Sequence, residues 1–162
     1  MTPVPTLDLQ RYAGTWYEIA RLPNPFQKKC AHSVVVRYAV REDGRLDVVN
    51  ECTEADGRAS RARGVARRAS AQAPPSQLKV RFAPAFLSFL SAVWGDYWVI
   101  DLAPDYGYAV VGEPKGEYLW ILSREPRMPE PLYAEVLARA ARFYDVSRVV
   151  RTEQRPPVAP CG

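Results

Sequence analysis

Gly14-Thr15-Trp16-Tyr17-Glu18-Ile19-Ala20-Arg21 is the stretch that decides the fold. It has the composition of a β-strand that opens on a glycine, with a tryptophan two positions later. The glycine lets the backbone bend sharply where the chain enters the strand, and an indole is large enough to close one end of a small barrel. An ordinary aromatic core strand fits this octapeptide equally well, so the rest of the chain must decide between the two.

Length and composition predict one globular domain. A chain of 162 residues can bury one core, and its 48% hydrophobic and 25% charged residues are typical of a soluble globular protein. We expect a single domain over 1–162, with its core over about 7–152 and a proline-rich tail over 153–162. No apolar run reaches the roughly 18 residues that a membrane span needs. A charged-then-apolar leader is also absent, which indicates a mature form, a shortened form or a protein that is never exported.

The net charge of +4 raises nucleic acid or an anionic membrane surface as partners. The basic residues are dispersed, and their densest group lies in one strand-like stretch without interleaved aromatic residues: Arg58, Arg61, Arg63, Arg67 and Arg68. We interpret this group as a solvated strand face and expect no nucleic-acid partner. The cysteine spacing fits no zinc motif, and the single histidine, His32, is expected in a surface loop, so no metal and no cofactor are predicted.

Alternating apolar and polar residues predict eight successive strands. The turns between them include Asp43-Gly44 and Asp56-Gly57, because Asp-Gly readily takes the positive φ angles of hairpin turns. The expected strands cover 15–22, 33–41, 58–69, 78–82, 96–102, 108–112 and 118–124, together with a return strand that begins at 46 and extends past 50. In 96–102 and 118–124 both faces are apolar, so alternation leaves open which face points inward.

The strand over 58–69 has an undersized inner face made of Ala62, Gly64 and Ala66. Such small residues would leave a solid core underfilled, whereas in a cavity wall they make room for a guest molecule.

One helix is predicted, over Leu132–Tyr144, with Pro131 at a favourable first position. Its apolar residues form one stripe that we expect to pack against the outside of the sheet: Tyr133, Val136, Leu137, Ala140 and Tyr144. A short last strand over Ser147–Thr152 follows. Eight antiparallel strands and one C-terminal helix describe an all-β, up-and-down β-barrel whose interior can hold one small ligand. The periodicity does not exclude a β-sandwich.

Three short regions in order along the chain resemble the signature regions of the lipocalins. They contain Gly14 with Trp16, Asp105 with Tyr106, and Arg124. The longer stretches 14–21 and 118–124 resemble the bacterial subgroup of outer-membrane lipoproteins, which is similar to apolipoprotein D and to plant temperature-induced lipocalins. The resemblance implies a barrel with one closed end, where the Arg124 guanidinium stacks on the Trp16 indole. We read these five residues as structural.

The resemblance also implies a lipid guest, a lysophospholipid or a fatty acid. Inner-face parity gives eight candidate wall residues: Val36, Tyr38, Val48, Ala62, Ala66, Leu78, Val80 and Phe82. Tyr97 and Trp120 join them because the resemblance places these two near a bound lipid. A long acyl chain gains about 0.8 kcal/mol per buried methylene. Parity with Trp16 also turns Glu18 inward, where its carboxylate needs a partner that the sequence does not name.

By family connectivity the uncharged loop over 83–95 lies at the open end. Its large apolar residues are Phe86, Leu87, Phe89, Leu90 and Trp94. An uncharged loop of this length needs a cover or a partner. It either folds onto the barrel rim, or forms a membrane-touching or ligand-entry lip assisted by Lys28, Lys29 and Arg81, or makes a homodimer contact.

Cys30 and Cys52 flank the first hairpin and are predicted to form a disulfide. They lie 13 and 8 residues from the Asp43-Gly44 turn, so a bulge or a flexible loop at Cys30 must absorb the difference in register. Cys161 is expected to stay free in the tail. A disulfide implies an oxidising compartment such as the periplasm. The resemblance to the bacterial subgroup further implies that the protein is associated with the outer membrane through a lipid anchor outside this sequence.

The favoured function is non-enzymatic lipid transport or storage in envelope maintenance. One alternative is an isomerase-type enzyme with Cys52 as a cavity thiol; no Ser–His–Asp set or phosphate-binding loop supports catalysis. A tetrapyrrole or haem binder is the other, and it is discouraged because His32 is the single histidine.

Overall fold

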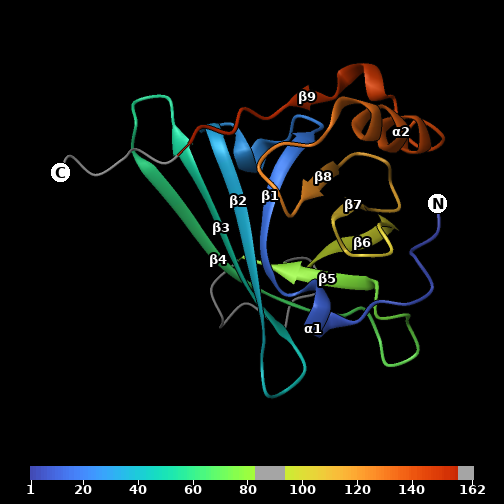
Figure 1. Cartoon of the computed structure of the whole chain (residues 1–162). Coiled ribbons are helices and arrows are strands. Elements are labelled where there is room, and N and C mark those ends of the chain that lie inside the picture. Colours follow the sequence, from blue (N-terminus) through green and yellow to red (C-terminus); the bar gives the residue numbers. More distant parts are fainter. Residues whose placement is uncertain (83–93, 157–162) are drawn as a thin grey trace.

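The computed structural model describes residues 1–82 and 94–156 and shows a closed antiparallel barrel (Figure 1). Its strands are β1 (Gly14–Arg21), β2 (Cys30–Val40), β3 (Leu46–Glu54), β4 (Ala59–Arg68), β5 (Gln77–Arg81), β6 (Gly95–Leu102), β7 (Tyr108–Gly112) and β8 (Leu119–Ser123). Each strand pairs with the next, and β1 pairs with both β8 and β2. That last pairing closes the sheet on itself, so the up-and-down barrel is confirmed and the β-sandwich is excluded.

Both predicted hairpin turns are present. Gly44 and Gly57 have φ angles of 84° and 90°, values that favour glycine. In each turn the preceding aspartate accepts a hydrogen bond from the backbone N–H two residues later, at 3.0 Å for both Asp43 and Asp56. The turn chemistry read from the sequence therefore fixes the registers of β2–β3 and β3–β4.

The barrel has one core inside and another between its wall and a helix. The helix α2 (Glu130–Ala140) packs Tyr133 and Val136 against the outside of the wall, where Val110 and Ile121 face it. The inner core instead contains at least one residue from each of the eight strands, and its members include Trp16, Tyr38, Val48, Ala66, Leu78, Val99, Val111 and Leu122. This settles the parity that alternation left open, because Tyr97, Val99, Trp120 and Leu122 belong to the inner set.

The C-terminal elements differ from the prediction. The helix ends at Ala140 rather than Tyr144, because Arg142 and Phe143 donate to carbonyls three residues back, which tightens the last turn. The expected last strand is also shorter: a 3₁₀ turn over Val146–Arg148, capped by Asp145, takes its first residues. Only Val150–Arg151 remain as β9, paired with β1.

The segment after β9 fills a seam between β1 and β2. These two strands pair directly only from Gly14–Tyr17 to Val35–Tyr38. Beyond that point the Gln154 side-chain amide donates to Glu18 O at 2.9 Å and to Val34 O at 2.8 Å, so it bridges both strands. The backbone continues the contact, since Ser33 N donates to Glu153 O at 2.7 Å.

The predicted disulfide between Cys30 and Cys52 is confirmed, with an S–S distance of 2.06 Å. The expected irregularity is also present, because the β2–β3 register shifts between Cys30 and His32 and again between His32 and Val35. The loop assignment of His32 is wrong: β2 begins at Cys30, so His32 is a half-buried strand residue, with Nδ1 2.9 Å from Ser33 Oγ.

Replacing Cys30 and Cys52 together with serine is expected to lower the free energy of unfolding by about 3 kcal/mol. The two cysteines are 22 residues apart in the sequence. Without the bond the unfolded chain has a higher conformational entropy, which lowers the stability of the folded state. Urea denaturation of the double variant measures the loss. The parent protein under reducing conditions should match the variant, and an undiminished midpoint for both would contradict the prediction.

The closed end is built around Trp16, as predicted. The Arg124 guanidinium carbon lies 3.8 Å from the centroid of the Trp16 ring, which confirms the stack. Arg124 also donates to three backbone carbonyls, those of Arg11, Thr15 and Tyr106, at 2.5, 3.1 and 3.3 Å. The short helix α1 (Leu9–Tyr12) enters from below (Figure 1), and Trp16 Nε1 donates to Tyr12 O at 2.8 Å. Asp105 accepts from Gly107 N at 2.8 Å in the adjoining turn.

Candidate functional site

Strand register places every predicted wall residue except Phe82 on the inward face. Trp16 pairs with Val36, Val36 with Asn50 and Asn50 with Ala62, so this row points into the barrel. Two further rows face the same way, one through Tyr38, Val48 and Gly64 and the other through Leu46, Ala66 and Val80. Leu78 pairs with Tyr97 on this face as well. Alternation already placed Asn50 on the inner face with Leu46 and Val48, but Asn50 was not among the predicted wall residues.

The interior is packed at the closed end and accessible toward the other end, the mouth. Tyr12, Trp16 and Leu78 are fully buried. Three inward residues near the mouth ends of their strands keep solvent exposure: Ala62 is exposed, and Val80 and Trp120 are half-buried. Tyr97, which pairs with Leu78 deeper in the barrel, is half-buried as well. Solvent-accessible inward residues of this kind are what a ligand cavity open at the mouth requires.

Phe82 lies at the rim rather than in the wall. It follows the last residue of β5, and 43% of its surface is exposed. A Cβ atom on Gly64 would lie 2.8 Å from Phe82 Cδ1 and 2.4 Å from the Arg81 carbonyl oxygen. The space that glycine was expected to leave for a guest is therefore occupied by the Phe82 ring at this level of the barrel.

Three tyrosine hydroxyls meet deep in the interior. The Tyr97 hydroxyl lies 2.5 Å from both the Tyr12 and the Tyr38 hydroxyl. Burial is the main cause that raises the pKa of each of these phenols, so all three are neutral near pH 7 and act as both donors and acceptors. Tyr12 was missed as an inner residue because it precedes β1, although it lies four residues before Trp16.

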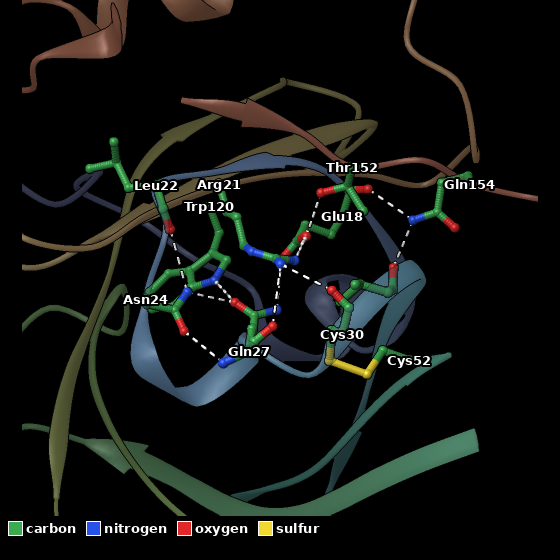
Figure 2. A network of polar contacts seen from close by, with 11 residues as sticks. Glu18, Arg21, Leu22, Asn24, Gln27, Cys30, Cys52, Trp120, Thr152 and Gln154 are labelled. Atoms are coloured by element: carbon green, nitrogen blue, oxygen red, sulfur yellow. Dashed lines mark hydrogen bonds and ion pairs between the residues drawn. A yellow bond between two sulfur atoms is a disulfide. The ribbon is translucent and has the colours of Figure 1, made fainter. Parts of the chain in front are cut away.

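Glu18 is the inward carboxylate, 2% exposed, and the structure supplies its partners (Figure 2). Arg21 Nη1 donates to Oε2 at 2.8 Å, Gln27 Nε2 to Oε1 at 2.9 Å, and Thr152 Oγ1 to Oε2 at 2.5 Å. The buried charge is therefore paired with a cation and accepts three hydrogen bonds.

Gln27 connects this carboxylate to the first loop and to β8. Its side-chain oxygen accepts from Asn24 Nδ2 at 2.7 Å and from Trp120 Nε1 at 2.8 Å. Trp120, predicted as a wall residue from the resemblance, is thus held by the loop between β1 and β2 (Figure 2). Neither Asn24 nor Gln27 was selected from the sequence, because amides in a loop carry no periodic signal.

The predicted lip is described only at its end. Phe86, Leu87, Phe89 and Leu90 lie outside the described residues, as does Cys161. Trp94 is 5% exposed, and the guanidinium carbon of Arg67 lies 3.9 Å from its ring centroid and that of Arg81 5.2 Å away. The indole is therefore covered rather than presented at the surface.

Residues 1–82 and 94–156 contain neither a membrane-spanning helix nor a cluster of metal-ligating side chains. No helix there has the length and apolarity to cross a bilayer. In the same residues, no three His, Cys, Asp or Glu side chains are grouped so as to hold a metal ion.

Sequence and structure comparisons agree on the family. A model described as a lipocalin-like domain matches residues 7–154. Temperature-induced lipocalin-1 of Arabidopsis thaliana is 39% identical over 156 residues, covering 95% of this chain and 83% of the relative. The outer membrane lipoprotein Blc of Escherichia coli K12 is 36% identical over 155 residues, with the same two coverages of 95% and 83%. Insecticyanin from the tobacco hornworm Manduca sexta has the same fold, with a TM-score of 0.73 at 20% identity over 94% of this chain and 84% of that one. The protein belongs to the lipocalin family, whose members bind small hydrophobic ligands.

Proposed function

We propose that this protein binds a single-chain lipid, a lysophospholipid or a fatty acid, and carries or stores it in the cell envelope. The observation that supports this most directly is the inward face that stays accessible at Ala62, Val80, Tyr97 and Trp120. An acyl chain placed against such a wall gains affinity by burial, at about 0.8 kcal/mol per methylene, and needs few directional contacts.

Two observations favour binding over the alternatives. The isomerase alternative needs a free thiol at Cys52, and Cys52 is bonded to Cys30. The haem alternative rests on His32, whose ring lies beside Ser33 and the C-terminal segment near the start of β2. A non-enzymatic carrier, by contrast, needs neither a free thiol nor a histidine ligand.

An envelope location is supported by the disulfide and by the relatives. Disulfides persist in oxidising compartments such as the periplasm. Four of the relatives are named outer membrane lipoprotein Blc, from Escherichia coli, Citrobacter freundii and Vibrio cholerae. The lipid anchor, membrane contact through the loop over 83–95 and a homodimer all remain predictions from the sequence.

Replacing Ala62 with tryptophan is expected to weaken binding of a lysophospholipid at least about tenfold, because the indole would fill interior space that the acyl chain needs. Ala39 is the matched control, since it is exposed and lies between inward-facing Tyr38 and Val40 on the outer face of β2. Ala39→Trp should leave the affinity unchanged. Isothermal titration of both variants checks this, and equal affinities would contradict binding inside the barrel.

A further inference from the structure

A small hollow lies where β1 ends and the following loop turns back. Its volume is about 110 Å³, and it is lined by Arg21, Pro23, Asn24, Gln27, Lys28 and Val150. Two of these side chains are cationic, two are amides, and none is acidic. Building on the proposed function, we propose that this hollow binds the phosphate group of a lipid whose acyl chain occupies the barrel.

Arg21 is fixed with part of its guanidinium free for a ligand. Glu18 takes the Nη1 donor at 2.8 Å, whereas the carbonyls of Gln27 and Cys30 accept from Nη2 at 3.4 Å, the long limit of a hydrogen bond (Figure 2). The Arg21 side chain is 17% exposed and that of Glu18 only 3%. The acid thus orients the guanidinium while staying buried itself, so a ligand in the hollow meets the cation.

Lys28 supplies the second charge. It directly follows Gln27, at the end of the 3₁₀ turn over Pro25–Gln27, and it is exposed. Within residues 1–82 and 94–156 its ammonium forms no ion pair, so a bound anion would be its first partner. An ammonium and a guanidinium on one concave surface suit a phosphate group, since both make charge-assisted hydrogen bonds to its oxygens.

The hollow adjoins the barrel interior through Gln27. Gln27 lines the hollow, and its side-chain oxygen accepts from Trp120 Nε1, whose ring packs against the inner core. Arg21 pairs with Trp120 across β1 and β8, so both side chains leave the sheet on the same face. The volume is about that of three or four water molecules, which suits one headgroup and excludes an acyl chain. A chain inside the barrel would therefore have its head beside this hollow.

The test compares lipids that differ only in their headgroup. Binding of lysophosphatidic acid and of a monoacylglycerol with the same acyl chain is measured by isothermal titration for the parent, Lys28→Glu and Lys29→Glu. Lys29 is the matched control, because it is the neighbouring exposed lysine and does not line the hollow. Inorganic phosphate is added as a competitor in a separate arm, and thermal melts confirm that both variants are folded.

The parent should bind lysophosphatidic acid about tenfold more tightly than the monoacylglycerol, the size expected for one charge-assisted contact. Lys28→Glu should remove that preference and leave monoacylglycerol binding unchanged, whereas Lys29→Glu should keep it within about twofold. Phosphate should compete with lysophosphatidic acid alone if the site recognises free phosphate as well as a lipid head.

Three results would overturn the inference. The first is that the parent shows no preference between the two headgroups. The second is that both lysine variants lose the preference equally, which would indicate general electrostatic attraction, and the third is that Lys28→Glu weakens binding of the neutral monoacylglycerol as much as that of lysophosphatidic acid. In each case monoacylglycerol binding would still support lipid binding in the barrel. Failure of the parent to bind either lipid would instead contradict the proposed function.

Discussion

Replacing Glu18 with alanine is expected to lower the free energy of unfolding by about 3–5 kcal/mol, the loss typical of breaking a buried charge pair. The carboxylate is the common acceptor for Arg21, Gln27 and Thr152. Its removal leaves a largely buried guanidinium without its counter-ion and an amide and a hydroxyl without their acceptor. Urea denaturation followed by tryptophan fluorescence measures the effect.

The matched control for Glu18 is Glu42, an exposed glutamate next to the β2–β3 turn. Glu42→Ala should change stability by no more than about 0.5 kcal/mol, as for most surface substitutions. Glu18→Gln should fall between the two, because an amide keeps one acceptor oxygen but no charge. A Glu18→Ala variant as stable as Glu42→Ala would show that the buried network contributes little.

Replacing Arg124 with alanine is expected to cost about 4 kcal/mol, from the cation–π stack on Trp16 together with the charge-assisted hydrogen bonds to three carbonyls. Arg124→Lys should lose about half of this, because an ammonium cannot stack flat on the indole or reach three carbonyls in one plane. At roughly 2–4 °C per kcal/mol for a chain of this size, calorimetry should show Tm falling by about 10 °C for alanine.

Lipid affinity should not follow this loss of stability. Arg124 lies at the closed end, whereas the accessible inward residues lie toward the mouth. Titration below the variants' Tm should give lysophospholipid dissociation constants within about twofold of the parent's. Unchanged thermal stability of Arg124→Lys, or a selective loss of affinity, would assign Arg124 to binding instead of structure.

The barrel could be predicted because its signals are local. Alternation and the Asp-Gly turns predicted the strands and their order, whereas the closed end at Trp16 and Arg124 was implied by the resemblance to the lipocalins. The Cys30–Cys52 bond also followed from the first hairpin, once a bulge was allowed. The inferences on the strands and on the disulfide use residues on one strand or on neighbouring strands, where period and turn chemistry carry the information.

Predictions that depended on distant contacts were incomplete or wrong. Parity turned Glu18 inward, but one of its partners, Thr152, lies 134 residues along the chain. Phe82 has the right parity for a wall residue, and its place at the rim depends on where β5 ends. The end of α2 at Ala140 follows from hydrogen bonds that tighten its last turn, which a stripe of apolar residues cannot show.

The seam between β1 and β2 has a consequence for biosynthesis. A ribosome releases β1 first, yet β1 finds its second neighbour only when β8 emerges, and the Gln154 bridge forms only after residue 154 has emerged. Until then the strand has an open edge and Glu18 lacks Thr152. Folding from the N-terminus during synthesis therefore cannot complete this barrel before these residues emerge. A nascent chain that stops before residue 152 should need a chaperone or be degraded.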